Sequence, residues 1–153
     1  MNKYKVHHIS EVESTNSLVR NSLSNFQDHT LVVADYQTLG RGRRANRWSA
    51  EKGKNFLGTF YKTSRKATSF RFLLEASVAL LKTLESFGVS GSIKPPNDVY
   101  VNDRKIAGIL IEIIHGDALN VITGIGLNVK HSNSLSYLAL EDVLEETLDV
   151  KSV

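Results

Sequence analysis

The sequence contains no cysteine, only two prolines and a single tryptophan in 153 residues. The lack of cysteine excludes disulfides, thiolate catalysis and cysteine-ligated metal sites, and it is compatible with a reducing compartment. No proline-rich linker, internal repeat or low-complexity segment marks a domain boundary. A chain of this length fits one compact domain with a sizeable core, so residues 1–153 are expected to form a single domain.

Long hydrophobic runs and a strong charge of one sign are also missing. The longest apolar run, residues 109–114, is interrupted by Glu112 and is far too short to cross a membrane. Residues 1–9 contain no apolar segment of the kind found in signal peptides, so a cytoplasmic protein is expected. The formal net charge is +3, from 19 Lys+Arg against 16 Asp+Glu, which is too small a surplus to indicate a nucleic-acid partner.

Positive charge is instead concentrated between Asp35 and Trp48. Glycine lets a backbone approach a ligand closely, arginine offers a planar fork of donors to carboxylate or phosphate oxygens, and an indole ring can stack on a purine. The stretch therefore suggests a clamp for an anionic nucleotide, although a solvated basic loop or a loop that contacts nucleic-acid phosphates fits the same residues. These positions are Gly40, Arg41, Gly42, Arg43, Arg44, Arg47 and Trp48.

A second polar cluster follows at Lys94-Pro95-Pro96-Asn97-Asp98. The two prolines stiffen the approach to the amide and the carboxylate, and the alternative is a simple turn. Ten residues on, Ala107-Gly108 leaves a small, open backbone position where a ligand could lie flat against a sheet. The two clusters together make a site more plausible than either does alone.

Alternating apolar residues and turn signals predict an α+β fold. Ser14 or Thr15 is a good N-cap for a helix that continues toward Phe26. A longer helix is expected over 67–87, with Phe70, Leu74, Leu80 and Leu84 on its apolar face and Gly88 at its end. The expected strands are 4–9, 30–36, 56–61, a hairpin of 99–101 with 105–114, and 119–129; an acidic helix is expected over 137–150.

Five motifs follow one another along the chain: Ser14-Thr15-Asn16, Gly40-Arg41-Gly42-Arg43-Arg44 with Trp48, Lys94-x-Pro96-Asn97-Asp98, Arg104 to Glu112, and Gly124 to Asn128. In this order they resemble the motifs of biotin protein ligases, and the resemblance covers about residues 8–130. The resemblance implies a mixed β-sheet flanked by helices, as in the biotin synthetase fold related to class II aminoacyl-tRNA synthetases. It also implies an ATP-dependent, AMP-forming ligase that makes biotinyl-5′-adenylate and transfers biotin to a lysine of a biotin carboxyl carrier domain.

The resemblance also implies roles for individual residues, with biotin and ATP as substrates and Mg²⁺ as the metal ion. Arg43, Lys105 and Lys94 are the expected catalytic residues, and Asp98 the expected magnesium ligand. The expected biotin-binding residues are Ser14, Thr15, Asn16, Gln37, Gly40, Arg41, Gly42 and Gly108. The expected nucleotide-binding residues are Arg44, Trp48, Asn97 and Asn128.

The sequence departs from the family pattern in two respects. Pro95 stands where the family usually has tryptophan. Many members also carry a C-terminal SH3-like domain, and bifunctional members carry an N-terminal helix-turn-helix that binds DNA. Neither is recognisable in 1–153, so no DNA partner is expected. A homodimer is compatible with the resemblance. Two alternatives remain: a lipoate protein ligase, which shares the adenylate chemistry, and a truncated module that binds biotin or its adenylate without catalysis.

Overall fold

The computed structural model describes residues 4–66 and 68–153, and it is built on one seven-stranded mixed sheet. The strand order is β1-β2-β3-β7-β6-β5-β4; β1 and β2 are parallel, and the other neighbours are antiparallel. The α+β class and the mixed sheet expected from the sequence are therefore confirmed. The strands are β1 Lys5–Val12, β2 Thr30–Gln37, β3 Asn55–Ser64, β4 Ser92–Lys94, β5 Asp98–Val101, β6 Arg104–Ile114 and β7 Leu119–Asn128.

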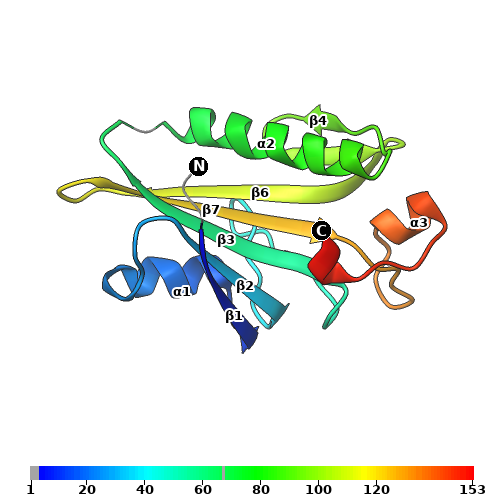
Figure 1. The fold of residues 1–153 in the computed structure, drawn as a ribbon, viewed down its shortest axis with the longest axis horizontal. Helices are drawn as coiled ribbons and strands as arrows, with labels where there is room; N and C mark the ends of the chain where they lie inside the picture. The colour runs from blue at the N-terminus through cyan, green and yellow to red at the C-terminus, as the bar shows by residue number, and fades with distance from the viewer. Residues whose placement is uncertain (1–3, 67) are drawn as a thin grey trace.

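The two main helices lie on opposite faces of this sheet, as Figure 1 shows for α1 (Thr15–Asn21) below it and α2 (Ser69–Ser86) above it. Side chains alternate between the faces along each strand. On β7, Ile122 packs in the cluster beside α1 and Leu127 packs in the cluster beside α2. The strands at the centre are therefore covered on both sides, which explains their nearly continuous apolar sequences.

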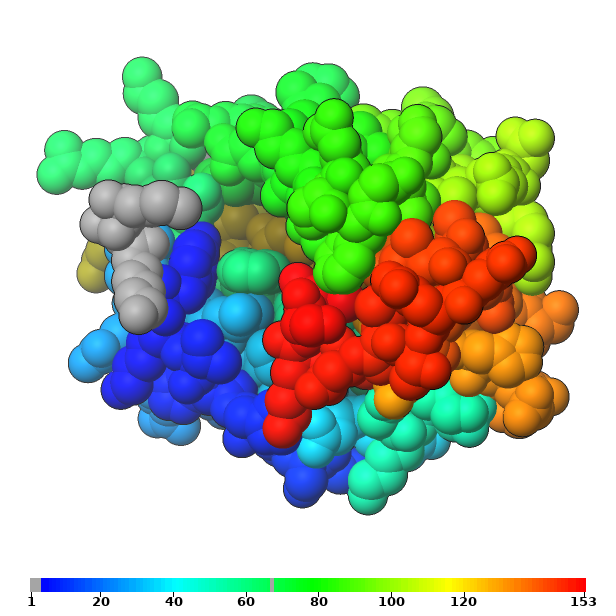
Figure 2. All heavy atoms as spheres, turned by 45° about the vertical axis from the view of Figure 1, so that its right-hand side comes forward, coloured from blue at the N-terminus to red at the C-terminus, as the bar shows by residue number. Residues whose placement is uncertain are grey.

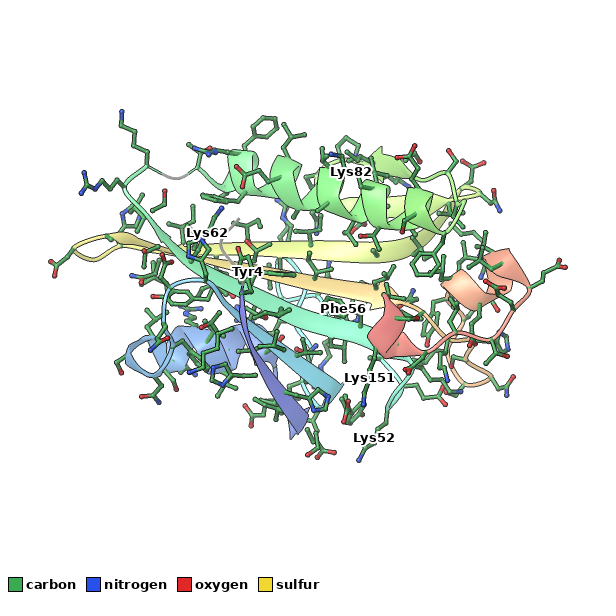
Figure 3. All side chains as sticks on the ribbon, viewed as in Figure 1. Tyr4, Lys52, Phe56, Lys62, Lys82 and Lys151 are labelled. Atoms are coloured by element: carbon green, nitrogen blue, oxygen red, sulfur yellow. The ribbon has the colours of Figure 1, made fainter. Side chains whose placement is uncertain are left out.

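Helix α2 buries only part of the face expected, because Leu80 and Leu84 are buried but Phe70 and Leu74 are exposed. Its buried residues recur every four positions, at Phe72, Ala76, Leu80 and Leu84, whereas Phe70, which was assigned to the buried face, is 74% exposed. Leu74 is exposed as well. Apolar residues of α2 therefore also occur outside its buried face, which is why the sequence did not show where the centre of that face lies. Figure 3 shows the side chains that fill the space between α2 and the sheet.

The ends of α2 follow ordinary capping rules. Thr68 is the N-cap, and its side chain accepts a hydrogen bond from the backbone N–H of Arg71. The predicted start at Ala67 lies outside the described residues. At the other end Phe87 is the C-cap, one residue before the expected position, and Gly88 follows it with a φ of 75°, a conformation that glycine adopts without strain.

Helix α1 begins at the cap that the sequence indicated. The Ser14 hydroxyl accepts from the backbone N–H of Ser17 at 3.3 Å. The helix is short, and a 3-10 turn over Leu23–Asn25 replaces its expected continuation. Val19 is fully buried against Val32 and Ile122, which fixes the N-terminus of α1 at the sheet.

The acidic segment at the end of the chain is not the helix expected over 137–150. It contains only a five-residue helix, α3 (Leu140–Leu144), and a 3-10 turn over Val150–Ser152. The carboxylate of Glu141 in α3 hydrogen-bonds to the chain on both sides of this short helix: it accepts from the backbone N–H groups of His131 and Leu148, each at 2.8 Å. In Figure 2 this orange and red segment packs beside α2, where Leu140 and Leu148 join the core.

A polar network ties the turn after residue 50 to the loop that follows β7. Glu51 pairs with Lys54 at 2.7 Å and accepts from Ser132 at 2.5 Å and Ser134 at 3.0 Å. These contacts lower the pKa of the Glu51 carboxyl to about 2, and the hydrogen bond with Lys54 has the largest effect.

Within residues 4–66 and 68–153, no helix combines the length and apolar character that crossing a membrane requires.

Candidate functional site

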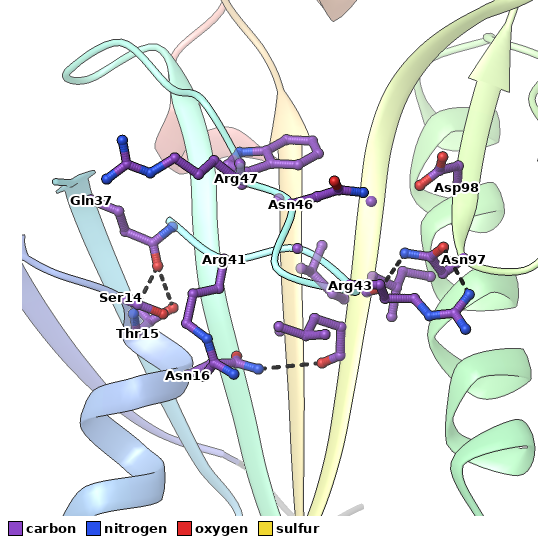
Figure 4. A pocket seen from close by; sticks show the side chains of 18 of the residues that line it. Ser14, Thr15, Asn16, Gln37, Arg41, Arg43, Asn46, Arg47, Asn97 and Asp98 are labelled. Carbon is purple, nitrogen blue, oxygen red and sulfur yellow. Dashed lines mark hydrogen bonds between the residues drawn. The ribbon is translucent and has the colours of Figure 1, made fainter. Parts of the chain in front are cut away.

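A cavity lies on the α1 face of the sheet, between the N-terminus of α1 and the start of β5 (Figure 4). The loop between β2 and β3 covers it. The space between its walls is about 690 Å³, and this figure includes a part that is open to solvent. Its walls are Ser14, Thr15, Asn16, Gln37, Arg41, Gly42, Arg43, Asn46, Arg47, Trp48, Gly58, Asn97, Asp98, Lys105, Gly108, Ile109, Leu110, Gly124, Ile125 and Gly126.

At one end of the cavity the wall consists of uncharged polar side chains, and the ion pair of Arg41 with Glu112 lies beside Asn16. This is the neutral end, because the two charges of the pair cancel. The Gln37 side-chain oxygen accepts from the backbone N–H and the hydroxyl of Thr15, at 2.7 and 3.0 Å. The buried Thr59 hydroxyl lies 2.7 Å from the Thr15 hydroxyl and 2.6 Å from the Asn16 side-chain oxygen. Threonine, asparagine and glutamine are thus held in fixed orientations, and they offer both donors and acceptors to a neutral polar ligand.

The opposite end carries charge. Lys105 on β6 lies 2.8 Å from Asp98 at the start of β5. The Arg43 guanidinium reaches Asn97 at 3.5 Å, and Asn97 in turn donates its side-chain N–H to the carbonyl of Ile109 at 2.8 Å. Two cations and one carboxylate therefore meet where the hairpin of β5 and β6 faces the covering loop.

The covering loop is itself a small hairpin from Gly40 to Trp48. The backbone N–H of Trp48 donates to the carbonyl of Gly40 at 2.9 Å, and that of Gly42 to the carbonyl of Asn46 at 2.7 Å. Arg44 and Ala45 form its tip with φ values of 52° and 63°. The long loop expected between two strands is confirmed, and its internal hydrogen bonds give it a defined shape.

The indole of Trp48 lies directly on the sheet. A Cβ placed on Gly126 would overlap the ring, and one on Gly108 would come within 2.9 Å of it. The flat position predicted at Gly108 is thus filled by a side chain of the protein. The indole Nε1 is buried, with no hydrogen-bond partner among the described residues, and the Lys105 ammonium is 5.3 Å from the ring centroid.

Most of the predicted site residues line this cavity, and four do not. Gly40 and Arg44 border the adjoining groove outside the hairpin. Asn128 is buried, accepting from Asn55 at 3.0 Å and donating to the carbonyl of Leu138 at 3.1 Å. Lys94 is exposed on β4, where its ammonium contacts Tyr100. The contacts predicted between these four residues and ligands stay predictions.

Asp98 is the one predicted metal ligand, and its surroundings are compatible with magnesium. Within the described residues, no three acidic, histidine or cysteine side chains gather into a cluster that could hold a metal ion by themselves. Mg²⁺ bound with a nucleotide commonly uses one or two protein carboxylates, the remaining ligands being phosphate oxygens and water. A single carboxylate beside two cations therefore fits a magnesium ion that arrives with a triphosphate.

Comparison with known proteins identifies the family. Residues 9–128 match the model of the biotin/lipoate A/B protein ligase family. The chain belongs to this family. The bifunctional ligase/repressor BirA of Escherichia coli is 32% identical over 123 residues, which cover 77% of this chain and 38% of BirA. The biotin–[acetyl-CoA-carboxylase] ligase of Paracoccus denitrificans is 31% identical over 129 residues, covering 79% of this chain and 53% of that enzyme.

Solved structures agree with the family membership. The biotin protein ligase from Aquifex aeolicus, in complex with biotin and ATP, superposes with a TM-score of 0.79 at 28% identity, covering 97% of this chain and 64% of that one. The fold expected from the sequence is thus the fold of a biotin protein ligase. The chain spans between about two fifths and two thirds of the length of these three relatives.

Two residues that orient the walls of the cavity were missed from the sequence. Thr59 orients the neutral end of the cavity, and Glu112 accepts from Asn16 at 3.0 Å and from both terminal nitrogens of Arg41. The alternation along β6 was a usable signal for the second, because Gly108 and Glu112 are four residues apart and so share a face of the sheet. Nothing in the sequence near Thr59 pointed to its partners.

Proposed function

We propose that this chain is a biotin protein ligase domain that activates biotin with ATP to biotinyl-5′-AMP and transfers the biotinyl group to a lysine of a biotin carboxyl carrier domain. The observation that carries the proposal is the polarity of one cavity, which is neutral and hydrogen-bonding at one end and cationic at the other. Biotin has the same polarity, with an uncharged ureido ring at one end and a carboxylate at the other. The family membership and the name of the Paracoccus relative, which is a biotin–[acetyl-CoA-carboxylase] ligase, support the same conclusion.

The neutral end positions the ureido ring. Hydrogen bonds hold the side chains that would contact the ring: Thr15 bonds to Gln37, and Asn16 bonds to Thr59. Binding the ring therefore costs little conformational entropy at these side chains. The carboxylate then extends toward Arg43 and Lys105. The Gly40–Trp48 hairpin closes this path from the solvent side, which limits hydrolysis of a reactive adenylate.

In the first half-reaction a biotin carboxylate oxygen attacks the α-phosphorus of ATP, the bond to the bridging oxygen breaks, and pyrophosphate leaves. Two anionic groups must approach each other, so the site has to supply positive charge as the new bond forms. Arg43 contacts the carboxylate and the α-phosphate, and Lys105 contacts the same oxygens. Asp98 would hold Mg²⁺, which when bound would supply positive charge to the phosphate oxygens. No protein acid or base is needed, because positioning carries the step.

In the second half-reaction the lysine amine of the acceptor attacks the carbonyl carbon of biotinyl-5′-AMP. An amide bond forms, the bond between the carbonyl carbon and the phosphate oxygen breaks, the amine loses a proton, and AMP leaves. The acceptor is proposed to be the carrier domain of a biotin-dependent carboxylase, as the Paracoccus name indicates for that protein. Cytoplasmic location is part of the proposal, and homodimerisation stays a prediction from the sequence.

Calorimetry tests the substrate, with biotin or lipoate titrated into the protein in the presence and absence of MgATP. Biotin should bind, lipoate should not, and MgATP with biotin should yield AMP-linked product and pyrophosphate. If the protein bound lipoate and not biotin, the chain would be assigned to the lipoate protein ligases of its family. Biotin binding without adenylate under any MgATP concentration would leave a binding module in place of an enzyme.

Adenylate formation by variants tests the cationic end. Arg43→Ala and Lys105→Ala should each lose about 3 kcal/mol of transition-state stabilisation, on the order of a hundredfold in rate. Both side chains face the cavity, so the free energy of unfolding should change little. Lys82→Ala, at an exposed position of α2 (labelled in Figure 3), is the control and should match the parent protein. An unchanged rate for Arg43→Ala or Lys105→Ala would refute the role assigned to that residue.

A further inference from the structure

Glu112 on β6 is the meeting point of three elements of the site. Its carboxylate is 16% exposed and accepts from Asn16 Nδ2 at 3.0 Å, Arg20 Nη1 at 3.1 Å, and Arg41 Nη1 and Nη2 at 3.2 and 3.1 Å. Asn16 and Arg20 come from α1, and Arg41 comes from the covering hairpin. No role in binding or chemistry has so far been given to Glu112.

The contact with Arg41 is two-pronged. Both terminal nitrogens of the guanidinium meet the two carboxylate oxygens, an arrangement that fixes orientation as well as distance. Arg41 Nη1 also donates to the Ser17 hydroxyl at 3.2 Å. Because Arg41 and Arg47 are paired across the hairpin, anchoring Arg41 anchors one side of the whole hairpin to β6 and α1.

Arg43 leaves the hairpin two residues further on. Among residues 4–66 and 68–153, its side chain makes a single hydrogen bond, of 3.5 Å to Asn97, which is close to the limit for such a bond. The position of Arg43 at the cationic end therefore depends on where Arg41 holds the hairpin. Displacement of a substrate-contacting group by about 1 Å is enough to impair binding and catalysis.

The contact with Asn16 fixes the neutral end. Asn16 Oδ1 lies against the Thr59 hydroxyl at 2.6 Å, and Nδ2 points to Glu112 and to the carbonyl of Leu110. A reversed amide would bring its oxygen against the carboxylate, so Glu112 selects one orientation of the side chain. One carboxylate thus sets the geometry of both ends of the cavity.

We propose that Glu112 is a positioning residue of the biotin site: it latches the Arg41 hairpin to the sheet and fixes the amide orientation of Asn16. This inference rests on the proposed function for the identity of the ligand, but the latch itself is a property of the ligand-free protein. Charge gives the proposal a distinctive sign. Removing a carboxylate makes the site more positive, which by long-range attraction alone would strengthen the binding of an anionic ligand, whereas loss of the latch weakens it.

The test compares Glu112→Gln with the parent protein in three measurements. Trypsin cleavage after Arg43, Arg44 and Arg47, followed by mass spectrometry without ligand, should be faster in the variant. The KM for biotin in adenylate formation should rise about tenfold, the lower range for loss of a hydrogen bond to a charged group. The kcat should fall by a smaller factor, because saturating biotin restores much of the alignment.

Glu75→Gln is the matched control. Glu75 on α2 also accepts from two cations, Arg71 at 2.9 Å and Lys62 at 3.3 Å, but it lies on the other face of the sheet. Its variant should show parent values for hairpin cleavage and for KM. Arg41→Gln breaks the same latch while Glu112 keeps Arg20 and Asn16, so it provides the test if Glu112→Gln does not fold.

Faster hairpin cleavage together with a raised KM, in Glu112→Gln or Arg41→Gln, supports the proposal. Parent-like cleavage and KM in either folded variant overturns it, as does tighter biotin binding in Glu112→Gln, which would show that charge outweighs position. If the parent protein binds no biotin, the proposed function fails, and the ligand-free cleavage still decides whether Glu112 is the latch.

Discussion

Two neighbouring glycines on β7 should respond differently to the same substitution. A Cβ on Gly124 would come within 2.9 Å of Asn16 Cγ and closer still to its oxygen, and a Cβ on Gly126 would overlap the indole of Trp48. Asn16 is 3% exposed and held by Thr59 and Glu112. Trp48 belongs to the covering hairpin and is partly exposed. Asn16 therefore cannot move away from a new Cβ, whereas the Trp48 side chain can.

The sizes follow from these constraints. Overpacking a fixed neighbour costs about 1–3 kcal/mol, while replacing glycine by alanine in an ordinary conformation regains about 0.4–1 kcal/mol through the unfolded chain. Gly124→Ala should therefore lower the free energy of unfolding by about 1–2 kcal/mol, or Tm by roughly 2–8 °C for a chain of this size. Gly126→Ala should change it by less than about 0.5 kcal/mol, because the indole leaves the sheet.

Thermal unfolding and tryptophan fluorescence together distinguish these outcomes, since Trp48 is the only tryptophan in the sequence. Gly126→Ala should shift the emission of Trp48 to longer wavelength with Tm nearly unchanged. Gly124→Ala should lower Tm and leave the emission wavelength unchanged. Gly116→Ala is the control, because a Cβ there meets no atom closer than 3.5 Å. Equal Tm values for Gly124→Ala and Gly116→Ala, or unshifted emission in Gly126→Ala, would refute the packing described for β7.

Two further predictions concern stability. Leu84→Ala should cost about 3 kcal/mol, since Leu84 is fully buried, whereas Leu74→Ala on the exposed face of α2 should cost less than about 1 kcal/mol; chemical denaturation measures both, and similar losses would restore the face expected from the sequence. Glu51→Gln should lower Tm near pH 7. Because the pKa of Glu51 is lowered from 4.5 to about 2, its contribution is present above pH 4.5 and disappears as pH falls toward 2, so the two melting curves should converge there; a Tm difference that does not depend on pH would contradict this origin.

The sequence allowed most of the sheet to be predicted because its strands carry their own local signals. Alternation and β-branched residues mark β6 and β7, and the Asn102-Asp103 turn joins β5 to β6. β4 was not expected, because its three residues are all exposed and show no alternation. Local patterns thus predicted the strands that are buried on at least one face.

The helices show where local patterns fail. The terminal segment 137–150 has helix-forming composition, yet Glu141 and Asp149 hydrogen-bond to loop N–H groups and the helix stops at Glu145 with a φ of 56°. Competition of this kind depends on tertiary neighbours such as His131, ten residues away from Glu141 in the sequence. No window confined to the segment contains that information.

Motifs brought together most of the cavity but not the contacts that orient it. Thr15 and Gln37 were assigned to one site, and the structure shows them hydrogen-bonded. The partners of Asn16 are 43 and 96 residues away, at Thr59 and Glu112. Thr59 lies outside the motifs. Glu112 ends one of them, but the sequence alone indicated no role for its carboxylate. Pairings at such separations follow from the register of β3, β7 and β6.

Trp48 changes the meaning of the glycines beneath it. Gly108 was predicted as an open position for a ligand, but Gly108 and Gly126 together leave a shallow place on the sheet that the indole occupies. A ligand in the cavity therefore meets the indole and the Lys105 ammonium beside it. Small residues in the β6 and β7 motifs thus serve the protein's own tryptophan, and the hairpin that carries it forms a wall of the site as well as its cover.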